Sequence, residues 1–423
     1  MNKSEKERIR EIIIHAVIPF VLIDVLLWSY FFSLGKAKGD GYYYIDTKGK
    51  IVNSRPFNGT GTPFNEDGIA FARQSSGQVA QHDGFMNTKG QIIGEYHSFQ
   101  FDPQGAFTFP HIITTTSGLM EVIDKDMKII ASKEFGKGRM KCYSDFSNGA
   151  SLVSIDRLDS SGVRFGYLNA DLEWVLKPQY LLAYPFTDEK LAAVMDSATG
   201  KWGFIDLDGK FINDERYCRV SPFSGGYALV QKDEDGKAAY INTDGDYITS
   251  FVFDFDKSQK GFSEGMAYVK YFNEGGYGYI NEKGEMAIDI SFGDAGEFSH
   301  GLAPVKNEKY VYIDKTGKTV IDGDFIRISR FSKDGYAAVV QDDKYGIIDA
   351  NGEWLFEPQF LVEDYDNSNE SNTILACLGV NVDPPDVENG YCIVYLKNGQ
   401  RVKKPKAKWL RWFTEKIESI RIA

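Results

Sequence analysis

A short phrase that recurs along most of the chain limits the fold more than any other feature of the sequence. It consists of an aromatic residue, a glycine, two hydrophobic residues, Asp or Asn, two variable residues and a second glycine, as in KWGFIDLDGK at 201–210. In five successive copies the second glycine stands at 209, 245, 284, 317 and 352, at intervals of 36, 39, 33 and 35 residues. A unit of ~37 residues cannot bury its own apolar face, so this period predicts an array whose neighbouring units pack on one another.

The turn inside the phrase occurs ten times. Asp or Asn opens it, because its side chain can accept a backbone N–H two residues later, and Gly closes it at a position that needs a positive φ angle. We therefore predict a four-residue hairpin turn of type I with a bulge. Met127 and Leu172 replace the glycine in the third and fourth copies, where we expect strained or altered turns. The copies are YIDTKGK (44–50), FMNTKGQ (85–91), VIDKDMK (122–128), YLNADLE (167–173), FIDLDGK (204–210), YINTDGD (240–246), YINEKGE (279–285), YIDKTGK (312–318), IIDANGE (347–353) and VYLKNGQ (394–400).

A second phrase, which begins with Phe-Ser and which we call the FS phrase, precedes each well-matched turn. It places a small Ala two residues before a Val, which is the period of a half-buried strand. An aromatic-bounded segment of fixed length comes before it, so each unit is predicted to hold three antiparallel strands and a short fourth segment. The clearest copies of the second phrase are FSGGYALV (223–230), FSEGMAYV (262–269), FSHGLAPV (298–305) and FSKDGYAAVV (331–340).

These residues carry a resemblance to WG repeats, also called KWG repeats, whose pattern is F-x-x-G-L-A-x-V, then W/Y-G-Y-I-D, then G-K-x-x-I. The resemblance runs from about residue 41 to 402, and it implies a β-repeat protein of a family defined by its repeat rather than by a chemistry. Ala238 and Ala239 depart from the aromatic–glycine pair, as do Tyr310 and Val311. The motif residues, which we assign a structural role, are Trp202, Gly203, Asp206, Gly209, Gly245, Tyr277, Gly278, Asn281, Gly284, Asp314, Gly317, Tyr345, Gly346, Asp349 and Gly352.

Two architectures fit an all-β array over 41–402. Nine or ten four-stranded blades would exceed the usual 4–8 of a β-propeller, whereas an open solenoid has no ceiling on its number of units. We therefore favour an open or superhelical array of antiparallel β-repeats, with a propeller as the alternative. In either case we expect the repeated rings to be mainly core residues; the competing interpretation is a stacking platform for sugars or other ligands.

The N-terminal region predicts a membrane anchor. Residues 12–34 are 23 mostly apolar residues, which as a helix would span about 34 Å, enough for a bilayer core. Asp24 near the centre is unfavourable by roughly 2.5–3.5 kcal/mol on insertion scales, and a buried soluble helix is the alternative. Four Lys or Arg precede the segment and two follow it, which places residues 1–11 in the cytoplasm and the array outside it.

The C-terminal region predicts a short amphipathic helix over 405–421. Its apolar stripe includes Trp409, Phe413 and Ile417, and basic residues flank the stripe. Such a helix would cap the open end of an array, or would lie on an anionic membrane surface. The whole chain has a formal net charge of −12, which argues against a nucleic-acid partner because phosphates would be repelled.

The sequence offers no catalytic, cofactor-binding or metal-binding motif. Its five histidines form no HExxH pair, and GxSxG, GxGxxG and Walker patterns are missing. The calcium-loop-like segment 231–242 lacks the first Asp and the final Glu. Four cysteines in a chain this long are expected to be single buried thiols, with a Cys377–Cys392 bridge as an alternative.

These features together predict a membrane-anchored binding or scaffold protein, not an enzyme, that is displayed outside the cytoplasm. Its expected partner is a protein or a cell-envelope polymer. A scaffold that faces the cytoplasm is the first alternative. A glycan-processing enzyme is the second, and it would require a pair of carboxylates brought together by the fold.

Overall fold

The computed structural model describes residues 36–38, 40–54, 56–57, 62–74, 82–96, 107–114, 119–135, 140–157, 162–233, 236–255, 261–272, 275–342, 344–361, 391–397 and 399–403. Within these ranges the chain forms β-strands and turns, as predicted for an all-β protein. The predicted membrane span 12–34 and C-terminal helix 405–421 lie outside them. No helix in the described ranges is long and apolar enough to span a bilayer.

The strands in the described ranges form nine small antiparallel sheets, which we call blades and number along the chain. Blade 1 consists of β1 (Gly41–Asp46) and β30 (Tyr391–Leu396). Blade 2 consists of β2 (Ile69–Gln74), β3 (His82–Asn87) and β4 (Ile92–Tyr96). Blade 3 consists of β5 (His111–Thr114), β6 (Leu119–Ile123) and β7 (Ile129–Glu134). Blade 4 consists of β8 (Met140–Cys142), β9 (Ser151–Arg157), β10 (Gly162–Leu168) and β11 (Trp174–Tyr180). Blade 5 consists of β12 (Leu182–Ala183), β13 (Ala192–Met195) and β14 (Trp202–Ile205).

The remaining blades repeat the same order. Blade 6 consists of β15 (Arg219–Val220), β16 (Tyr227–Gln231), β17 (Lys237–Asn242) and β18 (Phe253–Asp254). Blade 7 consists of β19 (Met266–Val269), β20 (Tyr277–Asn281) and β21 (Met286–Phe292). Blade 8 consists of β22 (Asp294–Ala295), β23 (Leu302–Lys306), β24 (Tyr310–Asp314) and β25 (Thr319–Asp322). Blade 9 consists of β26 (Arg327–Ile328), β27 (Tyr336–Gln341), β28 (Lys344–Asp349) and β29 (Trp354–Leu361).

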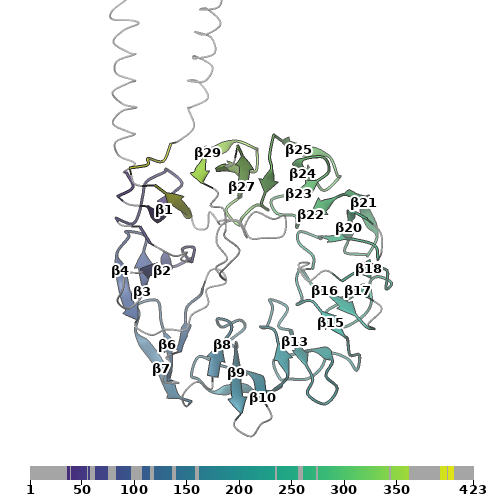
Figure 1. The fold of residues 1–423 in the computed structure, drawn as a ribbon. Coiled ribbons are helices and arrows are strands. Elements are labelled where there is room, and N and C mark those ends of the chain that lie inside the picture. The colour runs from purple at the N-terminus through teal and green to yellow at the C-terminus, as the bar shows by residue number, and fades with distance from the viewer. Residues whose placement is uncertain are drawn as a thin grey trace, which may run out of the picture.

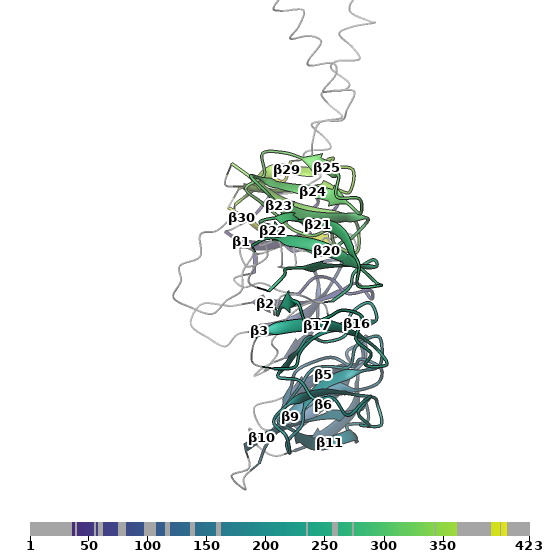
Figure 2. The ribbon, with the colours of Figure 1, turned by 90° about the vertical axis from the view of Figure 1, so that its right-hand side faces the viewer.

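The blades follow one another around a ring. Figure 1 shows β8 and β22 at the inner ends of their blades, and β7 and β25 at the outer ends. Figure 2, turned by 90°, shows the same ring from its side. Each blade with four strands is a simple meander from the inner strand to the outer strand. The arrangement is that of a β-propeller.

The ring is closed by its two ends, so the expectation of an open or superhelical array was wrong and the propeller alternative is right. β1 pairs with β30 along six residues, from Gly41 opposite Leu396 to Asp46 opposite Tyr391. β30, the last strand in the described ranges, supplies the partner strand of β1. A repeat count cannot reveal such closure, because it depends on curvature that accumulates over all the blades.

This pairing also corrects the count of ten turns. In blade 6, Tyr227 of the second strand lies opposite the turn residue Asn242, and Tyr391 lies opposite Asp46 in the same way. The phrase VYLKNGQ at 394–400 therefore begins in a second strand and is not a tenth turn-bearing unit. Its third residue is Leu396, where the other nine copies have Asp or Asn.

The core lies between neighbouring blades rather than inside any one of them. One cluster joins Phe204 of blade 5 to Tyr217 and Phe223 of blade 6. The cluster at the ring closure joins residues of blades 1, 2 and 9, including Tyr44, Met86 and Phe356, with Leu396 from β30. Each unit buries its apolar face on the next, as the period of the repeat predicts.

Candidate functional site

The nine turns have the predicted geometry. In blade 5, the Asp206 carboxylate accepts the backbone N–H groups of Asp208 at 3.0 Å and of Lys210 at 2.9 Å. The N–H of Gly209 donates to the Asp206 carbonyl at 3.0 Å, and Gly209 has a φ of +78°. The same position in blades 3 and 4 is taken by Met127 and Leu172 at φ values of 62° and 58°. These two residues hold the left-handed conformation that was expected to be strained there.

The strand glycines Gly278 of β20 and Gly346 of β28 lie where the backbone of the next strand comes very close. A Cβ atom at Gly278 would lie 2.7 Å from the backbone oxygen of Ile288, and one at Gly346 would lie 2.6 Å from that of Phe356. The strand register shifts at both glycines. The outer strand therefore bulges over the glycine, as expected for Gly within a strand.

The predicted motif residues occupy structural positions that the fold spreads around the ring. Trp202 and Tyr345 are buried, while Tyr277 is partly buried. Asp206, Asn281, Asp314 and Asp349 open turns; Gly209, Gly245, Gly284, Gly317 and Gly352 close them; and Trp202–Gly203, Tyr277–Gly278 and Tyr345–Gly346 lie in β14, β20 and β28. They are not brought together at one place.

A repeated tyrosine contact between neighbouring blades was not predicted from the sequence. The Tyr167 hydroxyl donates to the backbone oxygen of Tyr184 in the next blade at 2.7 Å, and the Tyr312 hydroxyl donates to that of Ser329 at 2.7 Å. Burial raises the pKa of the Tyr167 phenol well above its usual value, so the donor stays protonated at neutral pH. The available signal was the Tyr that stands two residues before the turn-opening Asp or Asn. The same contact links Tyr44 to Thr62 and Tyr279 to Gly296.

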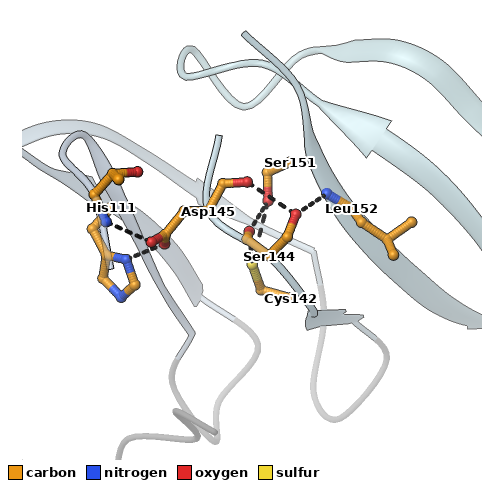
Figure 3. A network of polar contacts seen from close by, with 7 residues as sticks. His111, Cys142, Ser144, Asp145, Ser151 and Leu152 are labelled. Carbon is orange, nitrogen blue, oxygen red and sulfur yellow. Dashed lines mark hydrogen bonds and ion pairs between the residues drawn. The ribbon is translucent and has the colours of Figure 1, made fainter. Parts of the chain in front are cut away.

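A polar network joins blades 3 and 4 (Figure 3). His111 Nδ1 lies 2.5 Å from an oxygen of the Asp145 carboxylate, whose other oxygen accepts the Thr108 N–H at 2.6 Å. The hydroxyl of Ser144 donates to the Asp145 carbonyl, and that of Ser151 donates to the Ser144 carbonyl. Histidine, aspartate and serine thus lie near one another, as they do in many hydrolases.

The chemistry of this network is that of a structural contact. Both serine hydroxyls donate to backbone carbonyl oxygens, so their protons are used in holding the chain. Burial raises the pKa of the nearby Cys142 thiol to about 11, and the thiol donates to the Ser144 carbonyl at 3.2 Å. A thiol is a poor nucleophile until it ionises. Cys142 is therefore protonated and weakly reactive at neutral pH.

We predict that Asp145→Ala lowers the free energy of unfolding of the protein. The change removes the acceptor of the Thr108 N–H and the partner of the nearly buried His111, which should cost about 1–3 kcal/mol. Urea unfolding of the full-length protein measures the loss. Asp171→Ala, at an exposed turn position, is the matched control and should leave the midpoint nearly unchanged. Equal midpoints for the two variants would contradict a structural role for the network.

The closure of the ring places the two ends of the described chain side by side. The N–H of Ala37 donates to the Gln400 carbonyl at 3.0 Å, and the N–H of Gly399 donates to the Ala37 carbonyl at 2.9 Å. The side-chain amide of Gln359 in β29 fixes the last residues, because it donates to the Lys403 carbonyl and accepts the Lys403 N–H. Residues 36–37 and 399–403 therefore lie together where blades 1 and 9 meet.

Metal ligands are not assembled in the part of the chain that the structure describes, where no three His, Cys, Asp or Glu residues are grouped. The calcium-loop-like segment connects β16 to β17 and continues into β17. Cys142 and Cys218 are free thiols. Cys392 is buried in the closure cluster, and Cys377 lies outside the described residues, so their pairing stays an open alternative.

Comparison with known proteins agrees with the repeat. The WG containing repeat family matches residues 165–196, 202–235, 239–273, 277–310, 312–345 and 345–360. The matched segments lie between residues 165 and 360 and cover less than half of the chain; within them the repeats are similar to those of this family. No curated protein matches the sequence.

Several solved structures share parts of the arrangement at low identity. BamB from Moraxella catarrhalis is 12% identical, with 75% of this chain and 92% of that chain covered and a TM-score of 0.34. A eukaryotic initiation factor is 13% identical over 66% and 81% of the chains, with a TM-score of 0.44. Virginiamycin B lyase from Staphylococcus aureus is 12% identical over 55% and 85%, with a TM-score of 0.28. These scores are too low to bear on function, and the fold assignment rests on the strand pairing of this chain.

Proposed function

We propose that the protein is a membrane-anchored binding or scaffold protein whose ring is displayed outside the cytoplasm, where it binds a protein or a cell-envelope polymer. The apolar segment 12–34 would be the single membrane span, with residues 1–11 in the cytoplasm. The ring offers a rigid surface, because its turns, strand glycines and tyrosine contacts all serve to hold the blades together. It is proposed to act by binding and not by catalysis, without a cofactor and without a nucleic-acid partner.

The observation that carries this proposal is the side-by-side placement of residues 36–37 and 399–403, the two ends of the described chain, where blades 1 and 9 meet. The hydrogen bonds between Ala37 and residues 399–400 fix the base of the N-terminal segment to the ring. A membrane span that leaves the ring at one rigid point would hold the other blades away from the bilayer. The Lys and Arg residues that follow Lys403 in the sequence favour contact with an anionic lipid surface.

A scaffold that faces the cytoplasm is the second candidate. The observation in its favour is that Cys142 and Cys218 are free thiols, as is usual in a reducing compartment. The two candidates place the ring on opposite sides of the membrane. The side on which the ring lies therefore separates them.

The experiment is a protease-protection assay on intact cells that express the protein with a cleavable tag after Ala423. External protease, applied after wall removal where a wall is present, should remove the tag while a cytosolic marker stays intact. A variant with Lys3, Lys6, Arg8 and Arg10 changed to Gln is the matched control, and it should show reduced cleavage because the charge bias that sets orientation is lost. A tag that survives until the cells are lysed would contradict the outward orientation and favour the second candidate.

A further inference from the structure

One backbone position recurs at the inner edge of six blades and can be compared directly. Its N–H donates to a carbonyl of the second strand at 2.8–2.9 Å in every case. In blades 2, 6, 8 and 9 the residue is small and buried, whereas in the adjacent blades 4 and 5 it is an exposed tyrosine. Tyr143 is 51% exposed and Tyr184 is 37% exposed. The six residues are Thr62, Tyr143, Tyr184, Ser221, Gly296 and Ser329.

Internal aromatic rings support both tyrosines. The ring of Tyr143 lies 5.3 Å from that of Phe165, and the ring of Tyr184 lies 5.3 Å from that of Trp202. Phe165 and Trp202 are the aromatic residues of the repeat's aromatic–glycine pair, so the motif backs the exposed rings from inside. The backbone of Tyr184 is held in addition by the Tyr167 hydroxyl. A site whose rings are already fixed loses little conformational entropy when a ligand binds.

The two tyrosines have amphipathic surroundings. Lys141 is exposed two residues before Tyr143, and Leu182, 44% exposed, stands two residues before Tyr184. β12 packs against β10, and one apolar cluster takes in Phe165 and Ala183. The two blades therefore bring two ring faces, an aliphatic side chain and a cationic hydrogen-bond donor to neighbouring inner strands.

We propose that Tyr143 and Tyr184 form a binding site for an uncharged glycan. A pyranose ring has an apolar C–H face that stacks on an aromatic ring, while its equatorial hydroxyls reach donors such as the tyrosine hydroxyls and Lys141. Each tyrosine ring lies beside one neighbouring ring of the repeat and keeps a large exposed area that is available for stacking. The net charge of −12 disfavours anionic polymers and leaves a neutral sugar chain unaffected.

The glycan site names the class of polymer within the proposed function and so rests on it. It is tested by calorimetric titration of the purified full-length protein with cellotetraose and with chitotetraose. At least one of them should bind, and Tyr143→Ser or Tyr184→Ser should weaken the binding at least about tenfold. Because the assay uses purified protein, its failure leaves the orientation result untouched. A failed protection assay likewise leaves the titration valid.

The control variants come from the chain itself. Blades 6 and 9 have serine at this backbone position, as Ser221 and Ser329. The variants Tyr143→Ser and Tyr184→Ser should therefore fold, and their thermal melts check this. Tyr247→Ser removes a tyrosine of similar exposure, 39%, after the outer turn of blade 6, and it should leave the affinity unchanged. The site is overturned if neither sugar binds, or if Tyr247→Ser weakens binding as much as the two serine variants do.

Discussion

Leu396→Asp is expected to destabilise the whole ring, not the first blade alone. Leu396 is fully buried in the cluster that joins blades 1, 2 and 9, and β30 is the strand that completes blade 1. A carboxylate in this position should cost about 3–5 kcal/mol. Urea unfolding followed by circular dichroism and tryptophan fluorescence should show one shifted transition. Val320→Asp, on an exposed side chain of β25, is the control and should shift it by less than about 0.5 kcal/mol.

A truncation tests closure in a more drastic way. Removal of all residues from Phe331 onward takes away β30 and three of the four strands of blade 9, β27 to β29, so blade 1 keeps only β1 and the closure cluster is exposed. An open array would keep its other units folded after this deletion, since each contacts only its neighbours. For the closed ring we expect loss of cooperative unfolding and of most β-sheet circular dichroism. A truncated chain that melts like the full-length protein would contradict the need for closure.

Gly284→Val is expected to cost more than a turn glycine usually does. The residue has a φ of +76°, and a Cβ atom there would lie 2.3 Å from the backbone oxygen of Ile248 in the preceding blade. Backbone strain alone costs about 1–3 kcal/mol, and the clash raises the total to about 3–5 kcal/mol. Gly301→Val is the matched control, because Gly301 has a φ of +74° with no atom within 4 Å of the added Cβ. Equal melting shifts for the two variants would show that the contact with blade 6 does not matter.

Leu172 does not provide the mild comparison that its place in a glycine-free turn indicates. Its side chain is fully buried and packs in the core cluster between blades 3 and 4. Valine there would remove a buried methylene and place a β-branched residue at positive φ, so a loss of about 1–3 kcal/mol is expected. The turn glycines of other blades face their neighbours at the same place. Leu172 fills that space and offsets its backbone strain by burial.

The local parts of the fold could be predicted because their causes lie within a few residues. The Asp or Asn at the start of each turn accepts N–H groups two and four residues later, and the glycine is fixed by its φ angle. The FS phrases correctly predicted strands such as β16, β23 and β27. Closure could not be predicted in the same way, because β30 contains no FS phrase and pairs with the far end of the chain.

The correspondence between Tyr143 and Tyr184 could not be predicted from the sequence, because the two residues lie at different distances from the phenylalanine that follows them. Tyr184, Ser221 and Ser329 each stand two residues before the phenylalanine of the FS phrase or its looser copy, whereas Tyr143 stands three residues before Phe146. The additional residue is Ser144, whose hydroxyl accepts the Leu152 N–H within the polar network. Alignment of the phrases alone therefore places Ser144 beside Tyr184. The backbone N–H of Tyr143 makes the hydrogen bond that Tyr184 makes in blade 5, whereas the hydroxyl of Ser144 makes the contacts of Ser221 and Ser329, so two residues of blade 4 share this position.

The pairing of β1 with β30 also sets the order in which a newly made molecule can mature. At about 5–20 residues per second, the roughly 350 residues between the two strands need on the order of 20–70 s to leave the ribosome. Throughout this time β1 has no partner along the edge that β30 will cover. A message cut short before codon 391 yields a protein that can never complete its first blade. The exposed apolar surface of such a product is a mark that proteases and chaperones recognise, so the last strand serves as a check on full-length synthesis.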